Sequence, residues 1–193
     1  MSEYNYDNHL KIRDALELYF LRYHFPNGGY HLKWFKIKIG PIYIPLPNTE
    51  ARIEAVKIHD IHHLLTGYEA ILEGEAEIGA WELASGCGRY YMAWILNAGS
   101  FFYGMFFFPR ALFTAFLKGR SIRSNLYYDT IYNDELLNKT VGELKEKAGM
   151  LTPAKNNAID YLLFLICSIV ILSMAVGFFY LLYNIVSKIF VCL

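Results

Sequence analysis

The chain has 193 residues, the length of one ordinary domain with a hydrophobic core, and its 18 basic and 18 acidic residues leave no net charge. A chain without net charge has no overall basic field to attract nucleic acid, so we expect no nucleic-acid partner. Hydrophobic residues make up 55% of the chain and aromatic residues 17%, which exceeds the usual share in soluble domains and favours association with a membrane.

The first 50 residues predict a helix followed by a short hairpin. Apolar residues recur at helical spacing from about Asn8 to His24, and the sequence PNGG at 26–29 ends that helix. Lysine and isoleucine then alternate over residues 36–39, and Gly40-Pro41 separates two β-branched runs, which predicts a short hairpin or extended arm. Two prolines, Pro45 and Pro47, are expected to end this arm.

Two helices with a break between them are predicted from residue 48 to residue 85. Asn48-Thr49-Glu50 is able to cap a helix that runs to about Leu65. Thr66-Gly67 interrupts the pattern, and a second helix is expected from near Tyr68 to about Ser85.

An almost wholly apolar run, residues 90–117, follows these helices. Its central part, Tyr91–Phe108, could be a second membrane span, a helix lying in the membrane interface, or the wall of a lipid-binding tunnel. Internal glycines, Asn97, Pro109 and Arg110 argue against a clean span and favour the tunnel or the interfacial helix.

The remaining chain predicts polar helices and then a membrane span. Residues 118–157 are polar, and Thr140 and Glu143 have the spacing of a capping box. Tyr161–Tyr183 carries no charge and is long enough to cross about 30 Å of hydrocarbon. Seven basic residues precede it between 118 and 155 and only Lys188 follows, which places the main domain in the cytoplasm by the positive-inside rule. We expect residues 1–157 to form one domain, 158–186 a transmembrane helix and 187–193 a short tail.

The three cysteines and the N-terminal sequence agree with a reducing, cytoplasmic side. The cysteines are odd in number and lack CxxC spacing, which argues against a disulfide framework and a cysteine-based zinc site. The first 20 residues carry charges throughout and contain no apolar segment typical of a secretory signal.

A cluster of histidines lies in the first of the two helices predicted between residues 48 and 85. His59 and His63 are four residues apart, so their rings lie on one helix face and can reach one metal ion. Asp60 lies about 100° around the helix and is either a third ligand or an acceptor that fixes a histidine tautomer. His62 competes with His63 for the second position. The alternative is a polar helix face with incidental histidines.

A carboxylate from the next helix can join this cluster only if the chain turns. Glu75 lies twelve residues after His63, about 18 Å along a straight helix, which is too far for a shared ion. The break at Thr66-Gly67 would allow the second helix to fold back and return Glu75 to the histidine face. Histidine and carboxylate ligands without thiolate fit Zn²⁺ best, with Fe²⁺ or Mn²⁺ as alternatives.

These residues resemble the motif of the Coq4 family of ubiquinone-biosynthesis proteins, which is HDxxH, eleven residues and then glutamate. Here the motif is HDIHH at 59–63 followed by Glu75. The sequence HLLTGY at 63–68, the pairs Gly74-Glu75 and Trp81-Glu82, and DELLNKTVGELKEKAGM at 134–150 also resemble the family. The resemblance covers roughly residues 52–150. Members of the family are usually peripheral on the membrane, so the predicted C-terminal span departs from the family pattern.

The resemblance implies a mainly α-helical fold, here with the short hairpin arm and the C-terminal transmembrane helix added. It implies a divalent metal, usually zinc, held by residues matching His59, Asp60, His63 and Glu75. It also implies a polyprenylated quinone precursor as partner and one of two functions. The first is oxidative decarboxylation of the head group at C1, where hydroxyl replaces carboxylate. The second is a non-catalytic scaffold that organises other quinone-biosynthesis enzymes.

We expect the enzymatic function, in a homo-oligomer on the cytoplasmic membrane, with the scaffold as the alternative. Glu82 lies seven residues after Glu75 on the same helix face and is a candidate catalytic residue, a support for a ligand, or a solvated carboxylate. Three other glutamates are expected on the surface: Glu69, Glu73 and Glu77. A metal-dependent phosphohydrolase is a third hypothesis, but it needs a further separated His and Asp that the sequence does not place.

Overall fold

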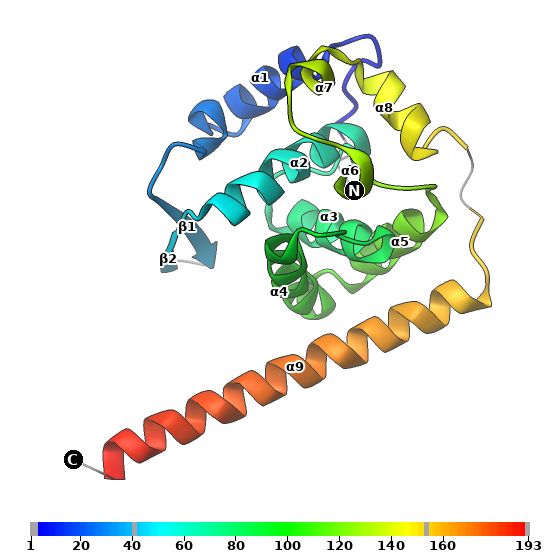
Figure 1. The fold of residues 1–193 in the computed structure, drawn as a ribbon. Coiled ribbons are helices and arrows are strands. Elements are labelled where there is room, and N and C mark those ends of the chain that lie inside the picture. Colours follow the sequence, from blue (N-terminus) through cyan, green and yellow to red (C-terminus); the bar gives the residue numbers. More distant parts are fainter. Residues whose placement is uncertain (1–3, 40–41, 153–154, 192–193) are drawn as a thin grey trace.

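The computed structural model describes residues 4–39, 42–152 and 155–191, which form a helical domain and one long C-terminal helix (Figure 1). The predicted mainly α-helical class, with a small hairpin, is confirmed. In chain order the elements are α1 (Ile12–Arg22), η1 (Pro26–Gly29), β1 (Trp34–Ile39), β2 (Ile42–Pro47), α2 (Glu50–Thr66), α3 (Leu72–Ser85), α4 (Tyr91–Phe107), α5 (Pro109–Ser121), α6 (Leu126–Asp129), α7 (Asp134–Asn138), α8 (Val141–Ala148) and α9 (Ala158–Val191).

The predicted hairpin is confirmed, and it ends where the sequence predicts. Strands β1 and β2 are antiparallel, with Trp34 opposite Pro47. The prediction that the arm ends at Pro45 and Pro47 is confirmed, because Pro47 is the last residue of β2 and Pro45 lies two residues before it. Each strand of a two-stranded hairpin has an outer edge, where the missing N–H of proline costs no ladder hydrogen bond. The predicted turn at Gly40-Pro41 lies outside the described residues.

The predicted break between α2 and α3 is confirmed. The side chain of Thr49 caps α2 by accepting a hydrogen bond from the Arg52 N–H, and α2 ends at Gly67, whose φ of 77° is left-handed. A Cβ on Gly67 would lie 2.9 Å from the carbonyl oxygen of Tyr4, so glycine is required there on two counts. Helix α3 begins at Leu72, later than predicted, because the Thr66 hydroxyl accepts the Tyr68 N–H and holds the connection out of helix.

Helix α3 forms the centre of the domain, with α2, α4 and α5 packed around it (Figure 1). Nine of its fourteen residues are buried, including Trp81 and Glu82. Helix α5 approaches closely because it has Gly119 at the contact: a Cβ there would lie 2.4 Å from the carbonyl oxygen of Trp81. Two charged side chains of α3, those of Glu77 and Glu82, are therefore buried in protein.

The long apolar run divides into α4 and α5 at Phe108-Pro109. One face of α4 packs on the core through Ala93, Asn97, Phe101 and Gly104. Among the described residues, one helix meets the length and hydropathy of a membrane span, and it is α9 rather than α4. The alternative of a second span over Tyr91–Phe108, which the sequence analysis did not favour, therefore has no support.

Helix α9 extends the predicted span at its C-terminal end. The segment Ala158–Ile185 is long and apolar enough to cross a membrane, in agreement with the predicted span over 158–186. The helix continues to Val191, through most of the segment predicted as a short tail. The predicted capping box of Thr140 and Glu143 is also confirmed at the start of α8.

Candidate metal centre

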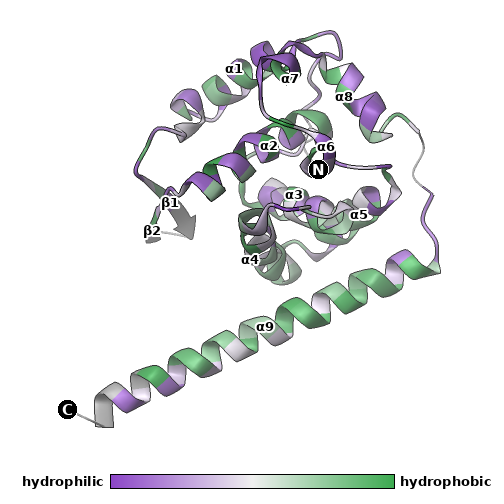
Figure 2. Ribbon diagram, in the orientation of Figure 1, coloured by the Kyte–Doolittle hydropathy of each residue, from purple (hydrophilic) through white to green (hydrophobic). Residues whose placement is uncertain are grey.

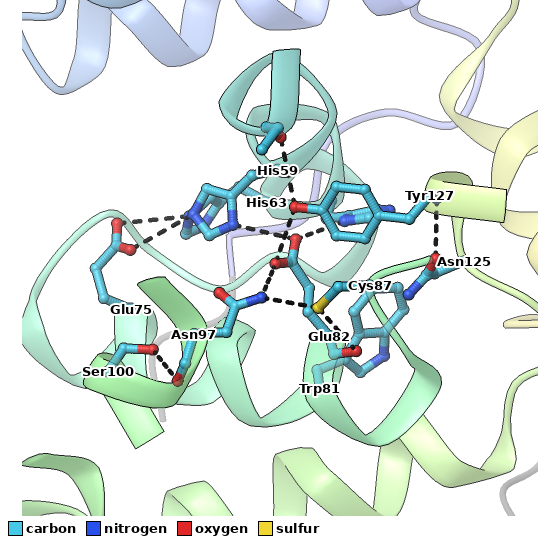
Figure 3. Close-up of polar contacts among 12 residues, drawn as sticks. His59, His63, Glu75, Trp81, Glu82, Cys87, Asn97, Ser100, Asn125 and Tyr127 are labelled. Carbon is cyan, nitrogen blue, oxygen red and sulfur yellow. Dashed lines mark hydrogen bonds and ion pairs between the residues drawn. The ribbon is translucent and has the colours of Figure 1, made fainter. Parts of the chain in front are cut away.

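Residues from α2 and the first turn of α3 bring His59, His63 and Glu75 together, as the sequence predicts (Figure 3). The Nε2 atoms of His59 and His63 are 3.1 Å apart. Oε2 of Glu75 lies 3.5 Å from the Nε2 atom of His59, and Oε1 of Glu75 lies 3.5 Å from that of His63. The three residues lie together because the chain reverses at Gly67 and returns α3 to the histidine face of α2.

In each of the two imidazoles, the hydrogen bond made by Nδ1 determines whether Nε2 has a lone pair available for a metal ion. His63 Nδ1 lies 2.8 Å from the carbonyl oxygen of Tyr68, which can only accept, so His63 Nδ1 carries the proton. His59 Nδ1 lies 3.1 Å from Glu82 Oε1 and donates to it in the same way. In the neutral rings both Nε2 atoms then carry lone pairs. Two lone pairs and a carboxylate face one another, an arrangement that needs a cation between them, either a proton or a metal ion.

The separations of these atoms fit a divalent metal ion. With bonds of about 2.0–2.1 Å, the ligand atoms of a tetrahedral Zn²⁺ lie about 3.3 Å apart. Here the two Nε2 atoms are 3.1 Å apart, and each lies 3.5 Å from a different oxygen of the Glu75 carboxylate. Two imidazoles and one carboxylate also form a donor set of known catalytic zinc sites, and Fe²⁺ and Mn²⁺ accept the same donor types. The cluster could therefore hold a metal ion without a large movement of its side chains.

The cluster is open on one side. The side chain of Glu75 is 39% exposed and that of His59 is 17% exposed, whereas that of His63 is 1% exposed. A three-ligand group that reaches solvent leaves a position for water or for an oxygen of a bound molecule, which is typical of catalytic rather than structural metal sites.

Asp60, which was predicted either as a third ligand or as an acceptor for a histidine, and which the resemblance implies as a ligand, lies outside this three-residue group. Its Oδ2 accepts a hydrogen bond from the Tyr30 hydroxyl at 2.5 Å, which ties the segment before β1 to α2. Burial raises the pKa of Asp60 to about 6, although the neighbouring His59 and the Tyr30 hydroxyl favour its charged form. Ligation by Asp60 stays a prediction, and it would require the carboxylate to turn away from Tyr30.

Glu82 lies behind the cluster and is fully buried, so it is not a solvated carboxylate. Its Oε1 accepts hydrogen bonds from Nδ1 of His59 and, at 2.6 Å, from Nδ1 of His62. Its Oε2 accepts from the Asn97 amide at 2.6 Å and from the Tyr127 hydroxyl at 3.1 Å (Figure 3). Four donors from α2, α4 and α6 thus satisfy one buried carboxylate, and one of them is a metal-ligand candidate.

Electrostatics reinforce this arrangement. Burial works against the charge of Glu82, but His59 and His62 outweigh it and hold the pKa of Glu82 well below its usual range. Burial likewise opposes the charged form of His59, but the carboxylates of Glu82 and Glu75 raise its pKa above the usual range. The cluster is therefore a site of negative potential that stabilises a positive charge at His59.

His62 has a structural role instead of competing for the metal. While its Nδ1 donates to Glu82, its Nε2 accepts the backbone N–H of Leu126 at 3.1 Å, so both ring nitrogens are engaged. Burial lowers the pKa of His62, which keeps the ring neutral in this position. Sequence spacing did not identify this role, nor the roles of Asn97 and Tyr127, because those partners come from helices distant in sequence.

The three glutamates predicted on the surface have different environments. Glu73 is partly exposed, and Glu69 forms an ion pair of 2.6 Å with Arg22. The prediction for Glu77 is wrong: it is 5% exposed, because α3 is covered by helices on several sides.

Comparisons with protein-family models, with curated proteins and with solved structures find no match to this chain. The resemblance to the Coq4 family therefore rests on the motif residues quoted above, and membership of that family stays a prediction.

Proposed function

We propose that the chain is a membrane-anchored, divalent-metal-dependent enzyme that acts on the C1 carboxylate of a polyprenylated aromatic precursor in quinone biosynthesis. The observation that carries the proposal is that the Nε2 atoms of His59 and His63 and the carboxylate of Glu75 face one another around one point and are open to solvent on one side. The resemblance of HDIHH and Glu75 to the Coq4 motif supports the choice of substrate.

The proposed reaction is an oxidative decarboxylation. The bond between C1 and the carboxylate carbon breaks, CO₂ leaves, and a hydroxyl oxygen takes its place on the ring. This is a two-electron oxidation: water supplies the hydroxyl oxygen, and a two-electron acceptor takes the electrons and two protons, as dioxygen does when it is reduced to hydrogen peroxide. A bound divalent metal, with Zn²⁺ as our first choice and Fe²⁺ or Mn²⁺ as alternatives, would act as a Lewis acid toward the carboxylate and phenol oxygens of the head group.

The residues of the chain would divide this work between binding and positioning. His59, His63 and Glu75 would hold the metal. Glu82 was a candidate catalytic residue, but it is fully buried and engaged by four donors, which favours a positioning role. By accepting a hydrogen bond from Nδ1 of His59, it would leave Nε2 as the nitrogen available to a metal ion and would make the ring a better ligand.

The open side of the cluster favours the enzyme over the non-catalytic scaffold. A metal that only stabilises a fold is surrounded by a closed ring of protein ligands, whereas Glu75 is 39% exposed. Helix α9 would anchor the protein in the cytoplasmic membrane, with the main domain on the cytoplasmic side where the basic residues lie. Contact with other quinone-biosynthesis enzymes, and a homo-oligomer, are further parts of this proposal.

The proposal is tested by deleting the gene in its host and identifying the quinone-related lipids. We expect a prenylated aromatic acid that retains its C1 carboxylate to accumulate. Plasmid copies carrying His63→Ala or Glu75→Ala should fail to restore the quinone, while His31→Ala, a change at an exposed histidine outside the cluster, should restore it. An unchanged lipid profile would refute the pathway, and full rescue by both cluster variants would refute the metal-dependent mechanism.

A further inference from the structure

The outward face of α4 is a continuous apolar surface. Seven residues at helical spacing form it, without a charge among them, and we name them the α4 outer stripe: Tyr91, Trp94, Ile95, Ala98, Phe102, Met105 and Phe106. Four of them are strongly exposed: Tyr91 at 59%, Trp94 at 42%, Ile95 at 59% and Phe106 at 61%. The opposite face, with Asn97 and Phe101, is buried in the domain. An exposed apolar surface of this extent marks an interaction site.

The first half of α9 packs directly on the layer formed by α4 and α5. The ring of Phe164 lies 5.8 Å from that of Phe101 on α4, and 4.9 and 5.3 Å from those of Phe113 and Phe116 on α5. Further along α9, Ile171 is 7% exposed and belongs to the same hydrophobic cluster. Figure 2 shows the hydrophobic colouring of α9 along most of its length, with α4 beside it.

These contacts determine how deep α4 would lie if α9 crosses a membrane. Ile171 follows Ala158 by thirteen residues, about 20 Å along the helix axis at 1.5 Å per residue, so it lies near the middle of the candidate span Ala158–Ile185. A minimal span of about 20 residues that ends at Ile185 begins at Ile166. Even then the packing of Cys167 and Ile171 against the α4–α5 layer takes place below the membrane surface.

The charges at the start of α9 agree with this depth. Asp160 in its first turn pairs with Arg120 at the C-terminal end of α5, at 3.0 Å. This pair would lie at the boundary between water and lipid, where charged groups remain solvated. Between residues 91 and 117 the one charged residue is Arg110, whose long side chain can extend toward lipid phosphates.

We propose that the α4 outer stripe is immersed in the leaflet that faces the main domain, so that the partner of this surface is the lipid bilayer itself. The domain would then lie partly within the membrane, on a platform of α4 and α5 beside the span. Because Gly104 of α4 packs against Ala76 on α3, next to Glu75, the platform ends beside the metal cluster. The inference rests on the membrane anchoring that forms part of the proposed function, and it is independent of the metal chemistry.

The three tryptophans of the chain allow a matched test in the full-length protein. Trp81 is buried and serves as a common background, Trp94 lies in the α4 outer stripe, and Trp34 is 59% exposed on β1. The variant Trp34→Phe reports Trp94, and Trp94→Phe reports Trp34. Each is reconstituted in phosphatidylcholine vesicles, its helix content is checked by circular dichroism, and its fluorescence is measured with brominated lipids and with aqueous iodide.

We expect brominated lipids to reduce the emission of Trp34→Phe well beyond that of Trp94→Phe, and iodide to do the reverse. If the protein floats with the vesicles but iodide quenches Trp94 and brominated lipids do not, the immersion is wrong while the anchor stands. Protection of Trp94 from both quenchers would mean that protein covers the stripe, which also overturns the proposal. If the protein does not float with the vesicles, the anchoring itself fails, whatever the metal content.

Discussion

One face of α3 carries two glutamates with opposite surroundings, Glu75 at its first end and Glu82 at its second end. Glu75 and Glu82 are seven residues apart and lie on the same face of the helix. At the first end, Glu75 is partly exposed and its oxygens meet the Nε2 atoms of two imidazoles. At the second end, Glu82 is fully buried and accepts hydrogen bonds from four donors.

This difference separates binding from support. A buried carboxylate with all its hydrogen bonds made has no capacity left for a ligand, but it fixes the groups that bond to it. A carboxylate that faces lone pairs and solvent is available for a cation. His59 joins the two ends, because its Nδ1 contacts Glu82 while its Nε2 contacts Glu75.

Stability should therefore depend on Glu82 far more than on Glu75. Glu82→Ala leaves His62, Asn97 and Tyr127 buried without their acceptor, and we expect the free energy of unfolding to fall by about 3–5 kcal/mol. Glu75→Ala should lower the metal-free value by only about 1 kcal/mol, because its pairing with the histidines is partly exposed to solvent. Chemical unfolding of the full-length protein in detergent, with a chelator present, measures both. Equal losses at the two positions would remove the distinction between the two ends.

The connection that returns α3 to α2 is the next most sensitive position. Gly67→Ala places a Cβ in a left-handed conformation and 2.9 Å from the carbonyl oxygen of Tyr4. We expect a loss of about 1–2 kcal/mol of stability. Since the reversal positions Glu75 against the histidines, metal affinity should also fall. The control is a second glycine, Gly99, where an added Cβ meets no atom within 4 Å. Wild-type stability and affinity in Gly67→Ala would contradict the role of the reversal.

The pH dependence of metal affinity should be a smaller effect than those of the two preceding variants, and it depends on the solvent-exposed cluster at Glu75. The carboxylates of Glu82 and Glu75 raise the pKa of His59, so in the metal-free protein a proton occupies the cluster to a higher pH than in free imidazole. A metal ion must displace that proton, so affinity should rise with pH, by up to about tenfold per unit below this pKa, and then level off. Isothermal titration across pH 6 to 9 checks the sign, with affinity that is flat or falls with pH as the contrary result.

The sequence predicted the open end of the site better than the closed end. Helix spacing and one glycine break, both local patterns, made a site of His59, His63 and Glu75 possible, and the resemblance to the Coq4 motif selected these residues over His62. The partners of Glu82 come from α4 and α6, and no local pattern indicates them. Glu77 was placed at the surface because glutamate is usually solvated, but the central position of α3 buries it. Asp60 satisfies the motif in sequence, while its hydrogen bond with Tyr30 depends on how the preceding segment folds.

The central claim is that the α2–α3 cluster binds a divalent metal ion, and the metal content of the purified full-length protein tests it most directly. Wild type and the control variant His31→Ala should each carry about one equivalent of a divalent metal after dialysis, or regain it on addition of Zn²⁺. His63→Ala and Glu75→Gln should lose it while keeping their helix content. Wild-type protein that binds no divalent metal, or cluster variants that bind it as well as wild type, would contradict the account.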